Sequence, residues 1–110
     1  MATIFHMGKK SPSVFPAGAR SLKALGERLR AARLRRRLTQ AVVATRIGVS
    51  TPTLAQLEAG NPRTSLATLL RLLEVLGLGT DIDRIAVDDE LGRRLQDMEL
   101  KDAPRGRGSR

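Results

Sequence analysis

The sequence contains no cysteine, no tryptophan and no tyrosine, and its aromatic side chains are Phe5 and Phe15 alone. Without cysteine the chain can form neither disulfides nor thiolate metal sites, which fits a reducing cytoplasm. A core without aromatic side chains has to be built from Leu, Val, Ile and Ala, and such a core favours helices over a β-sandwich. These absences predict an all-α protein.

Long apolar runs and sets of catalytic side chains are also missing. No stretch approaches the roughly 18 apolar residues that span a bilayer, and the opening MATIFHMGKK is too short and too mixed for a signal peptide. His6 is the single histidine, so no nucleophile–base set and no histidine metal site can be assembled. The sequence therefore predicts a cytoplasmic protein that is not an enzyme and has no cofactor, no metal and no membrane partner.

Positive charge is abundant: 20 Lys and Arg stand against 11 Asp and Glu, which gives a net charge of +9. Such an excess attracts a polyanion, whether nucleic acid, an anionic membrane surface or an acidic protein. Many arginines lie between residues 28 and 37, where a basic helix lying on lipid is an alternative reading. That segment has no Phe or Trp on its apolar side, which argues against the membrane.

The spacing of apolar residues divides the 110-residue chain into four parts. Residues 1–20 contain Pro and Gly without periodicity and are predicted to be a flexible arm. Residues 21–79 are predicted to form a helical domain, and residues 80–102 a helical extension. Residues 103–110 are predicted to be a disordered basic tail.

Within residues 21–79, capping signals predict four helices. Ser21, Thr39 and Ser50 are the expected N-caps, and Gly48, Gly60 and Gly77 the expected ends. The predicted helices run from Ser21 to about residue 36, from 40 to 47, from Ser50 to Gly60, and from 66 to 76. The residues predicted to face the core are Leu22, Leu25, Leu29, Ala32, Val43, Ala44, Ile47, Val49, Leu54, Leu57, Leu66, Leu69, Leu70, Leu73 and Leu76.

The stretch RIGVSTPTLAQLEAG, residues 46–60, leads from the second of these helices into the third. Two short helices joined by a glycine-containing turn form a helix-turn-helix, whose second helix projects residues into the DNA major groove. Leu54 and Leu57 are expected to seat that helix, and its small leading residues allow close approach to the bases. Gln56 lies on the same face as Thr53, and a glutamine can make paired hydrogen bonds to a base edge, typically adenine.

Residues 25–77 resemble the phage-repressor-like, or XRE, helix-turn-helix family, through LGERLRAAR, LTQAVVATRIGVS, TLAQLEAG and SLATLLRLLEVLG. The resemblance implies a five-helix, lambda-repressor-like fold. The base-reading positions that it implies are Thr51, Pro52, Thr53 and Gln56. The phosphate-contacting positions that it implies are Gln40, Ser50, Asn61, Arg63 and Thr64. It also implies a buried structural ion pair between Arg33 and Glu58.

Two residues depart from the family pattern. Arg37 stands at the end of the first helix, where the family has Gly or Asn and a left-handed conformation is expected. Pro52 stands at a base-facing position where polar residues are usual. Because its side chain has no donor, readout there is limited to a thymine methyl or is absent, and part of the specificity is expected to come from DNA shape.

The apolar residues after Leu76 are too many for a free tail and are expected to form a dimer or partner surface, or to cover the domain's own core. They are Ile82, Ile85, Leu91, Leu95, Met98 and Leu100. The segment DDELGRRLQDMELK also resembles extensions of HipB-type antitoxins, regulators that accompany HipA-type kinases. That resemblance implies a Ser/Thr kinase toxin as a partner.

Together these features predict a sequence-specific double-stranded DNA-binding repressor that acts as a homodimer on a pseudo-palindromic operator. The alternative is a protein-interaction module that uses the helix-turn-helix fold to hold a partner and binds DNA without sequence preference. RNA recognition is disfavoured because sequence-specific RNA modules stack bases on aromatic side chains.

Overall fold

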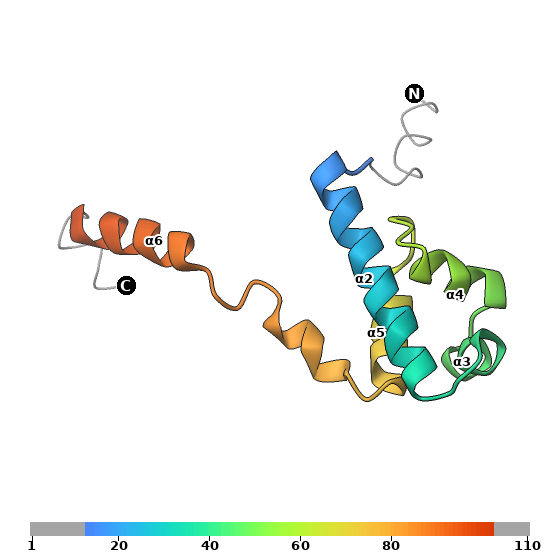
Figure 1. Cartoon of the computed structure of the whole chain (residues 1–110). Coiled ribbons are helices and arrows are strands. Elements are labelled where there is room, and N and C mark those ends of the chain that lie inside the picture. The colour runs from blue at the N-terminus through green and yellow to red at the C-terminus, as the bar shows by residue number, and fades with distance from the viewer. Residues whose placement is uncertain (1–12, 103–110) are drawn as a thin grey trace, which may run out of the picture. The chain divides into compact units, whose positions relative to one another are not determined.

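The computed structural model describes residues 13–102, and all regular secondary structure in that range is helical (Figure 1). The α-helices are α2 (Pro16–Arg35), α3 (Gln40–Ile47), α4 (Thr51–Glu58), α5 (Leu66–Val75) and α6 (Glu90–Asp102), and a 3-10 helix, η1, spans Gly79–Arg84. The predicted all-α helix-turn-helix fold is confirmed. The chain divides into two units, the first ending at Thr80 and the second starting at Asp81. The predicted tail, residues 103–110, and residues 1–12 of the predicted arm lie outside the described residues.

The first helix begins earlier than predicted, so the assignment of residues 16–20 to a flexible arm is corrected. Phe15 is the N-cap of α2, and Pro16 occupies the first turn. A proline is favourable there because its missing N–H has no partner in the helix and its φ is already helical. The Ser21 hydroxyl, expected to cap the helix, instead donates a hydrogen bond to the Ala17 carbonyl within it (3.2 Å).

The other helix ends follow the capping signals. The hydroxyl of Thr39 accepts a hydrogen bond from the Val42 amide (3.1 Å), and that of Ser50 accepts one from the Thr53 amide (3.2 Å). Gly48 ends α3 in the left-handed conformation, with φ of 77°. Local hydrogen bonding therefore fixes the limits of the two short helices and the turn between them.

The core of the first unit is aliphatic and draws on α2, α3, α4 and α5. α4 packs against α2 and α3, and α5 packs against α3. Leu72 on α5 is fully buried, whereas Leu66, predicted to face the core, is 76% exposed because it lies at the first helical position. The buried apolar residues are Leu29, Ala32, Val43, Ala44, Ile47, Leu54, Leu57, Leu72, Leu73 and Leu76.

Two glycines let α2 approach the end of α4 closely. A Cβ atom at Gly26 would overlap the Glu58 carbonyl oxygen, and one at Gly60 would lie 2.7 Å from the Lys23 Cα. Gly60 also has a φ of 82°, which disfavours any side chain. The two glycines therefore set the backbone spacing at which a side chain from α2 can reach Glu58.

The second unit carries α6, whose apolar side chains are exposed. The Asp89 carboxylate accepts a hydrogen bond from the Gly92 amide (2.9 Å) at the start of the helix. Leu91, Leu95 and Met98 are 61%, 55% and 61% exposed. The predicted helical extension begins with the 3-10 helix η1, which is followed by a turn in which Ala86 has a φ of 62°.

Arg37 follows α2 with a φ of 56°, the left-handed conformation that the family resemblance implies at this position. Any residue with a Cβ is strained there, whereas glycine is not. We expect Arg37→Gly to raise the free energy of unfolding by about 1 kcal/mol, measured by urea denaturation.

The matched control is Arg35→Gly, which removes the same charge from the last helical residue of α2. That substitution should lower the free energy of unfolding by about 1 kcal/mol, because glycine is unfavourable inside a helix. Equal losses in both variants would contradict the strain assigned to Arg37.

Candidate nucleic-acid interface

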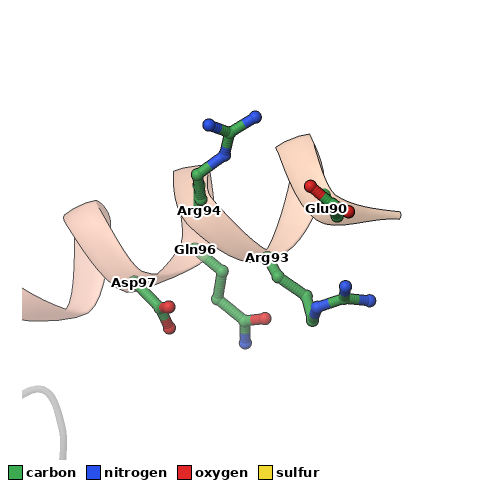
Figure 2. A pocket seen from close by; sticks show the side chains of 5 residues that line it. All are labelled: Glu90, Arg93, Arg94, Gln96 and Asp97. Atoms are coloured by element: carbon green, nitrogen blue, oxygen red, sulfur yellow. The ribbon is translucent and has the colours of Figure 1, made fainter. Parts of the chain in front are cut away.

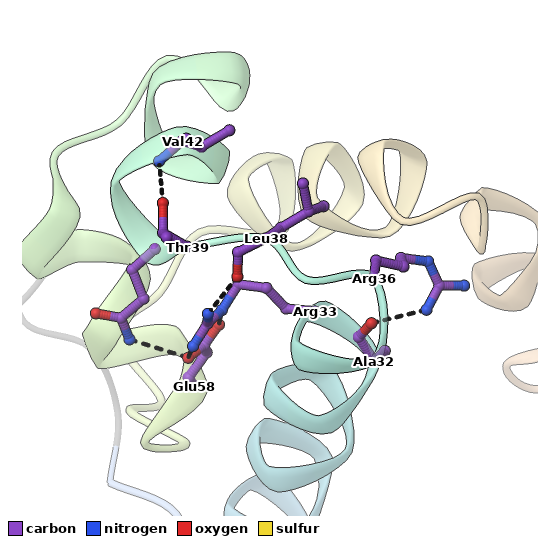
Figure 3. A network of polar contacts seen from close by, with 8 residues as sticks. Ala32, Arg33, Arg36, Leu38, Thr39, Val42 and Glu58 are labelled. Carbon is purple, nitrogen blue, oxygen red and sulfur yellow. Dashed lines mark hydrogen bonds and ion pairs between the residues drawn. The ribbon is translucent and has the colours of Figure 1, made fainter.

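A buried ion pair joins Arg33 on α2 to Glu58, the last residue of α4 (Figure 3). The Arg33 Nε donates to Glu58 Oε2 (2.7 Å) and Nη2 donates to Oε1 (3.0 Å), so the contact is bidentate. The two side chains are only 6% and 3% exposed. Arg33 Nη1 also donates to the Leu38 carbonyl (2.7 Å), which ties the link between α2 and α3 to the pair. The structure thus contains the pair that the family resemblance implies.

Gln40, the first residue of α3, joins this network. Its Nε2 donates to Glu58 Oε1 (3.0 Å), so one carboxylate connects α2, α3 and α4. Among the described residues, no buried side-chain polar atom lacks a hydrogen-bond partner. A buried ion pair is tolerated under this condition, because hydrogen bonds offset the loss of hydration.

The network shifts the acid–base equilibrium of both partners. Burial alone would raise the pKa of the Glu58 carboxyl, but hydrogen bonds from Arg33 and Gln40, with the positive charges of Arg33 and Arg30, lower that pKa below its usual value. The hydrogen bond to Glu58 raises the pKa of the Arg33 guanidinium further, against the opposing effect of burial. The pair is therefore fully ionised near neutral pH.

The predicted base-reading residues are exposed along α4. Thr51 and Pro52 begin the helix, and the hydroxyls of Ser50 and Thr53 are hydrogen bonded to each other (2.9 Å). Gln56 lies further along the helix, and its Oε1 accepts a hydrogen bond from Asn61 Nδ2 (2.7 Å). Small residues and one oriented amide therefore occupy the exposed part of α4.

Asn61 organises the loop after α4. Its Oδ1 accepts a hydrogen bond from the Arg63 amide (2.9 Å), an Asx turn, and its carbonyl accepts one from the Thr64 hydroxyl (3.0 Å). The structure thus brings Gln56, Asn61, Arg63 and Thr64 together. Gln40, at the start of α3, donates to Glu58 instead.

Three features of this surface were not predicted. The Gln56–Asn61 contact follows from the left-handed Gly60, because the Asn61 amide also bonds back to the Gln56 carbonyl (3.0 Å). Such a six-residue closure is the usual ending of a helix with glycine at this position, so Gly60 was an available signal. The bond from Gln40 to Glu58 had no such local signal.

The third unpredicted feature is an open hollow beside the start of α3, which Arg30, Arg37, Thr39 and Gln40 help to line. Arg30 and Arg37 are exposed there. Two exposed guanidinium groups next to a helix N-terminus create a positive potential that favours an anion.

A metal-ligand cluster and a membrane-spanning helix are both absent from residues 13–102. Within that range, no three His, Cys, Asp or Glu side chains gather as they would around a metal ion. None of the helices described there has the length and apolar character needed to cross a membrane.

Comparison with known families identifies the domain formed by the first unit. A family model described as a helix-turn-helix domain matches residues 24–85, more than half of the chain. The matched range contains the Arg33–Glu58–Gln40 network and the exposed residues of α4 and its following loop. No curated protein and no solved structure matches the chain.

The pKa of the Glu58 carboxyl is lower in the folded protein than in the unfolded chain, where a glutamate has a pKa of about 4.3. The ionised carboxylate therefore stabilises the fold at pH values above about 4.3. That contribution should be lost progressively as the pH falls below this value and through the lower pKa of the folded state. We expect Glu58→Gln to cost about 3 kcal/mol at pH 7, since it leaves Arg33 buried without a counter-charge. The difference in unfolding free energy between the two proteins should narrow in acid, as measured by urea denaturation from pH 7 to pH 3.

The control is Glu74→Gln on α5, which removes an exposed carboxylate. It should leave the free energy of unfolding at pH 7 within about 0.5 kcal/mol of the wild-type value. A difference for Glu58→Gln that stays constant down to pH 3 would show that Glu58 ionisation does not stabilise the fold.

Proposed function

The chain belongs to the helix-turn-helix domain family, and from this premise we propose that it is a sequence-specific double-stranded DNA-binding repressor that acts as a dimer. The observation that carries the proposal is the exposed polar surface of α4, with Gln56 held by Asn61 and the helix fixed by the buried network behind it. A recognition element has to be rigid and polar at once, and this surface is both. The net charge of +9 supports a polyanionic partner.

In the proposed complex α4 enters the major groove and reads bases with Thr51, Thr53 and Gln56, while Pro52 offers an apolar contact to a thymine methyl. The bond from Asn61 leaves both Nε2 hydrogens of Gln56 available to a base. Because the amide is already oriented, less side-chain entropy is lost on binding.

Phosphate contacts set the position of α4 on the duplex. We assign these contacts to Gln40, Ser50, Asn61, Arg63 and Thr64. The hollow lined by Arg30 and Arg37 supports a phosphate next to Gln40, since both guanidinium groups add positive charge where α3 begins. Repression then follows from occupancy of a promoter or operator in the cytoplasm.

The dimer is proposed because one helix-turn-helix covers one half-site, and a two-fold pair covers a pseudo-palindrome. Five of the apolar residues of the second unit supply the contact surface. They are Ile82, Ile85, Leu91, Leu95 and Met98, of which all but the half-buried Ile82 are exposed.

Within the family we assign the protein to the XRE, phage-repressor-like group, on the motifs of residues 25–77. The role of a HipB-type antitoxin that binds a HipA-type Ser/Thr kinase is a narrower proposal, supported by the resemblance of residues 88–101. Neutralisation of such a kinase and co-purification with it would support that role, and the lack of both would remove it.

A random double-stranded DNA pool tests the proposed function directly. Bound DNA selected at near-physiological salt should be enriched in a two-fold symmetric site with half-sites about 10 bp apart, because each subunit occupies one major groove. Salt-labile binding without an enriched sequence would overturn the proposal and favour the protein-interaction module instead.

Gln56→Ala should weaken binding to the selected site by about 1–3 kcal/mol, and binding to random DNA much less, because a base contact is lost. Affinities on both DNAs at one salt concentration, by fluorescence anisotropy, give the two losses. Gln96→Ala, which removes an exposed glutamine from α6, is the matched control and should change neither. Equal losses on both DNAs would show that Gln56 does not read a base.

A further inference from the structure

The exposed apolar face of α6 has a distinct charge on each side. Leu91, Leu95 and Met98 follow one another at helical spacing and form a stripe, the α6 stripe, whose members are more than half exposed. Figure 2 shows Arg93, Gln96 and Asp97 on one side of the helix and Arg94 on the other. At helical spacing, Arg93 and Gln96 lie away from the stripe, whereas Arg94 flanks it.

The flanks follow from the heptad positions. With Leu95 at position a, Leu91 and Met98 fall at position d, Arg94 and Lys101 at position g, and Glu99 at position e. One flank of the α6 stripe is therefore basic and the other acidic. Leu100 lies off the stripe, on the opposite face.

We propose that α6 pairs with α6 of a second copy as a parallel, in-register coiled coil. In a parallel pair, position g of one helix faces position e of the following heptad on the other. Arg94 of each copy then faces Glu99 of the other, and the two-fold axis repeats this attraction. The stripes pack against each other as alternating a and d layers.

The same charges disfavour the antiparallel alternative. In that arrangement g faces g and e faces e, so Arg94 and Lys101 of one copy meet Lys101 and Arg94 of the other. Like charges that face each other across the two helices oppose association. The charges at positions e and g therefore favour a second copy of this chain, in the parallel orientation, as the partner of the stripe.

The inference rests on the proposed function, since it names the surface by which the operator-binding dimer forms. Parallel pairing leaves both helix-turn-helix units at the same end of the paired helices. Residues 85–89 join η1 to α6 in each copy. Five extended residues reach at most about 17 Å, so two segments together reach about 34 Å, comparable with the spacing of half-sites on DNA.

Cysteine cross-linking of the full chain tests the orientation, because the native sequence has no cysteine. Leu91→Cys and Met98→Cys should each give disulfide-linked dimers under mild oxidation, since each residue lies next to its own copy in a parallel pair. Arg93→Cys, on the outer face, should give at least tenfold less. Linkage only when Leu95→Cys and Met98→Cys proteins are mixed would indicate an antiparallel pair, whose layers join position a to position d, and would overturn the proposal.

Charge reversal supplies a second test that leaves the apolar layers intact. Arg94→Glu should weaken dimerisation by about fivefold to thirtyfold in sedimentation equilibrium, because two attractions become repulsions. Glu99→Arg should do the same, and the double variant should restore the wild-type affinity. Stronger association of Arg94→Glu, or a wild-type chain that stays monomeric at about 100 µM, would overturn the parallel pair.

The experiments distinguish a failure of the proposed repressor function from a failure of the proposed pairing of α6. Cross-linking at residues 91 and 98 with no enriched DNA sequence would leave the pairing standing and remove the repressor function. An enriched DNA site bound by a chain that does not cross-link at either position would support DNA recognition and overturn the pairing.

Discussion

The fold of the first unit depends on one interaction, the buried ion pair between Arg33 and Glu58. Removing charged groups from water is unfavourable, and this pair is stable only because each hydrogen-bonding atom has a partner. Once formed, it holds the end of α2, the start of α3 and the last residue of α4 in fixed relation. The close backbone approach at Gly26 and Gly60 is a precondition, because any larger residue would move Glu58 away from α2.

The limits of the short helices could be predicted from sequence because they depend on neighbouring residues. A hydroxyl at Thr39 or Ser50 bonds to an amide three residues later, and Gly48 closes α3 within the same turn. The start of α2 is harder to predict, because Pro and Gly without apolar periodicity favour an arm, whereas a proline in the first turn also begins a helix, as Pro16 does here.

Contacts between distant residues could not be predicted in this way. Arg33 and Glu58 are 25 positions apart, so the resemblance to known repressors, and not the spacing of residues, indicated the pair. To predict the hydrogen bond from Gln40 to Glu58, one would need to know the relative positions of α2, α3 and α4. In α5, Leu66 lay on the predicted apolar stripe and is exposed, whereas Leu72 lay off that stripe and is fully buried; only the packing of the helices shows this difference.

The separation of the buried network from the exposed surface of α4 has an evolutionary consequence. Residues 26, 33, 58 and 60 constrain one another, so a change at any of them has to be compensated at another for the fold to survive. Thr51, Pro52, Thr53 and Gln56 lie outside that set, and substitutions there cost little stability. Under the proposed function, related chains can therefore diverge in the DNA sequence they recognise while the scaffold stays the same, and an engineer can retarget α4 in the same way.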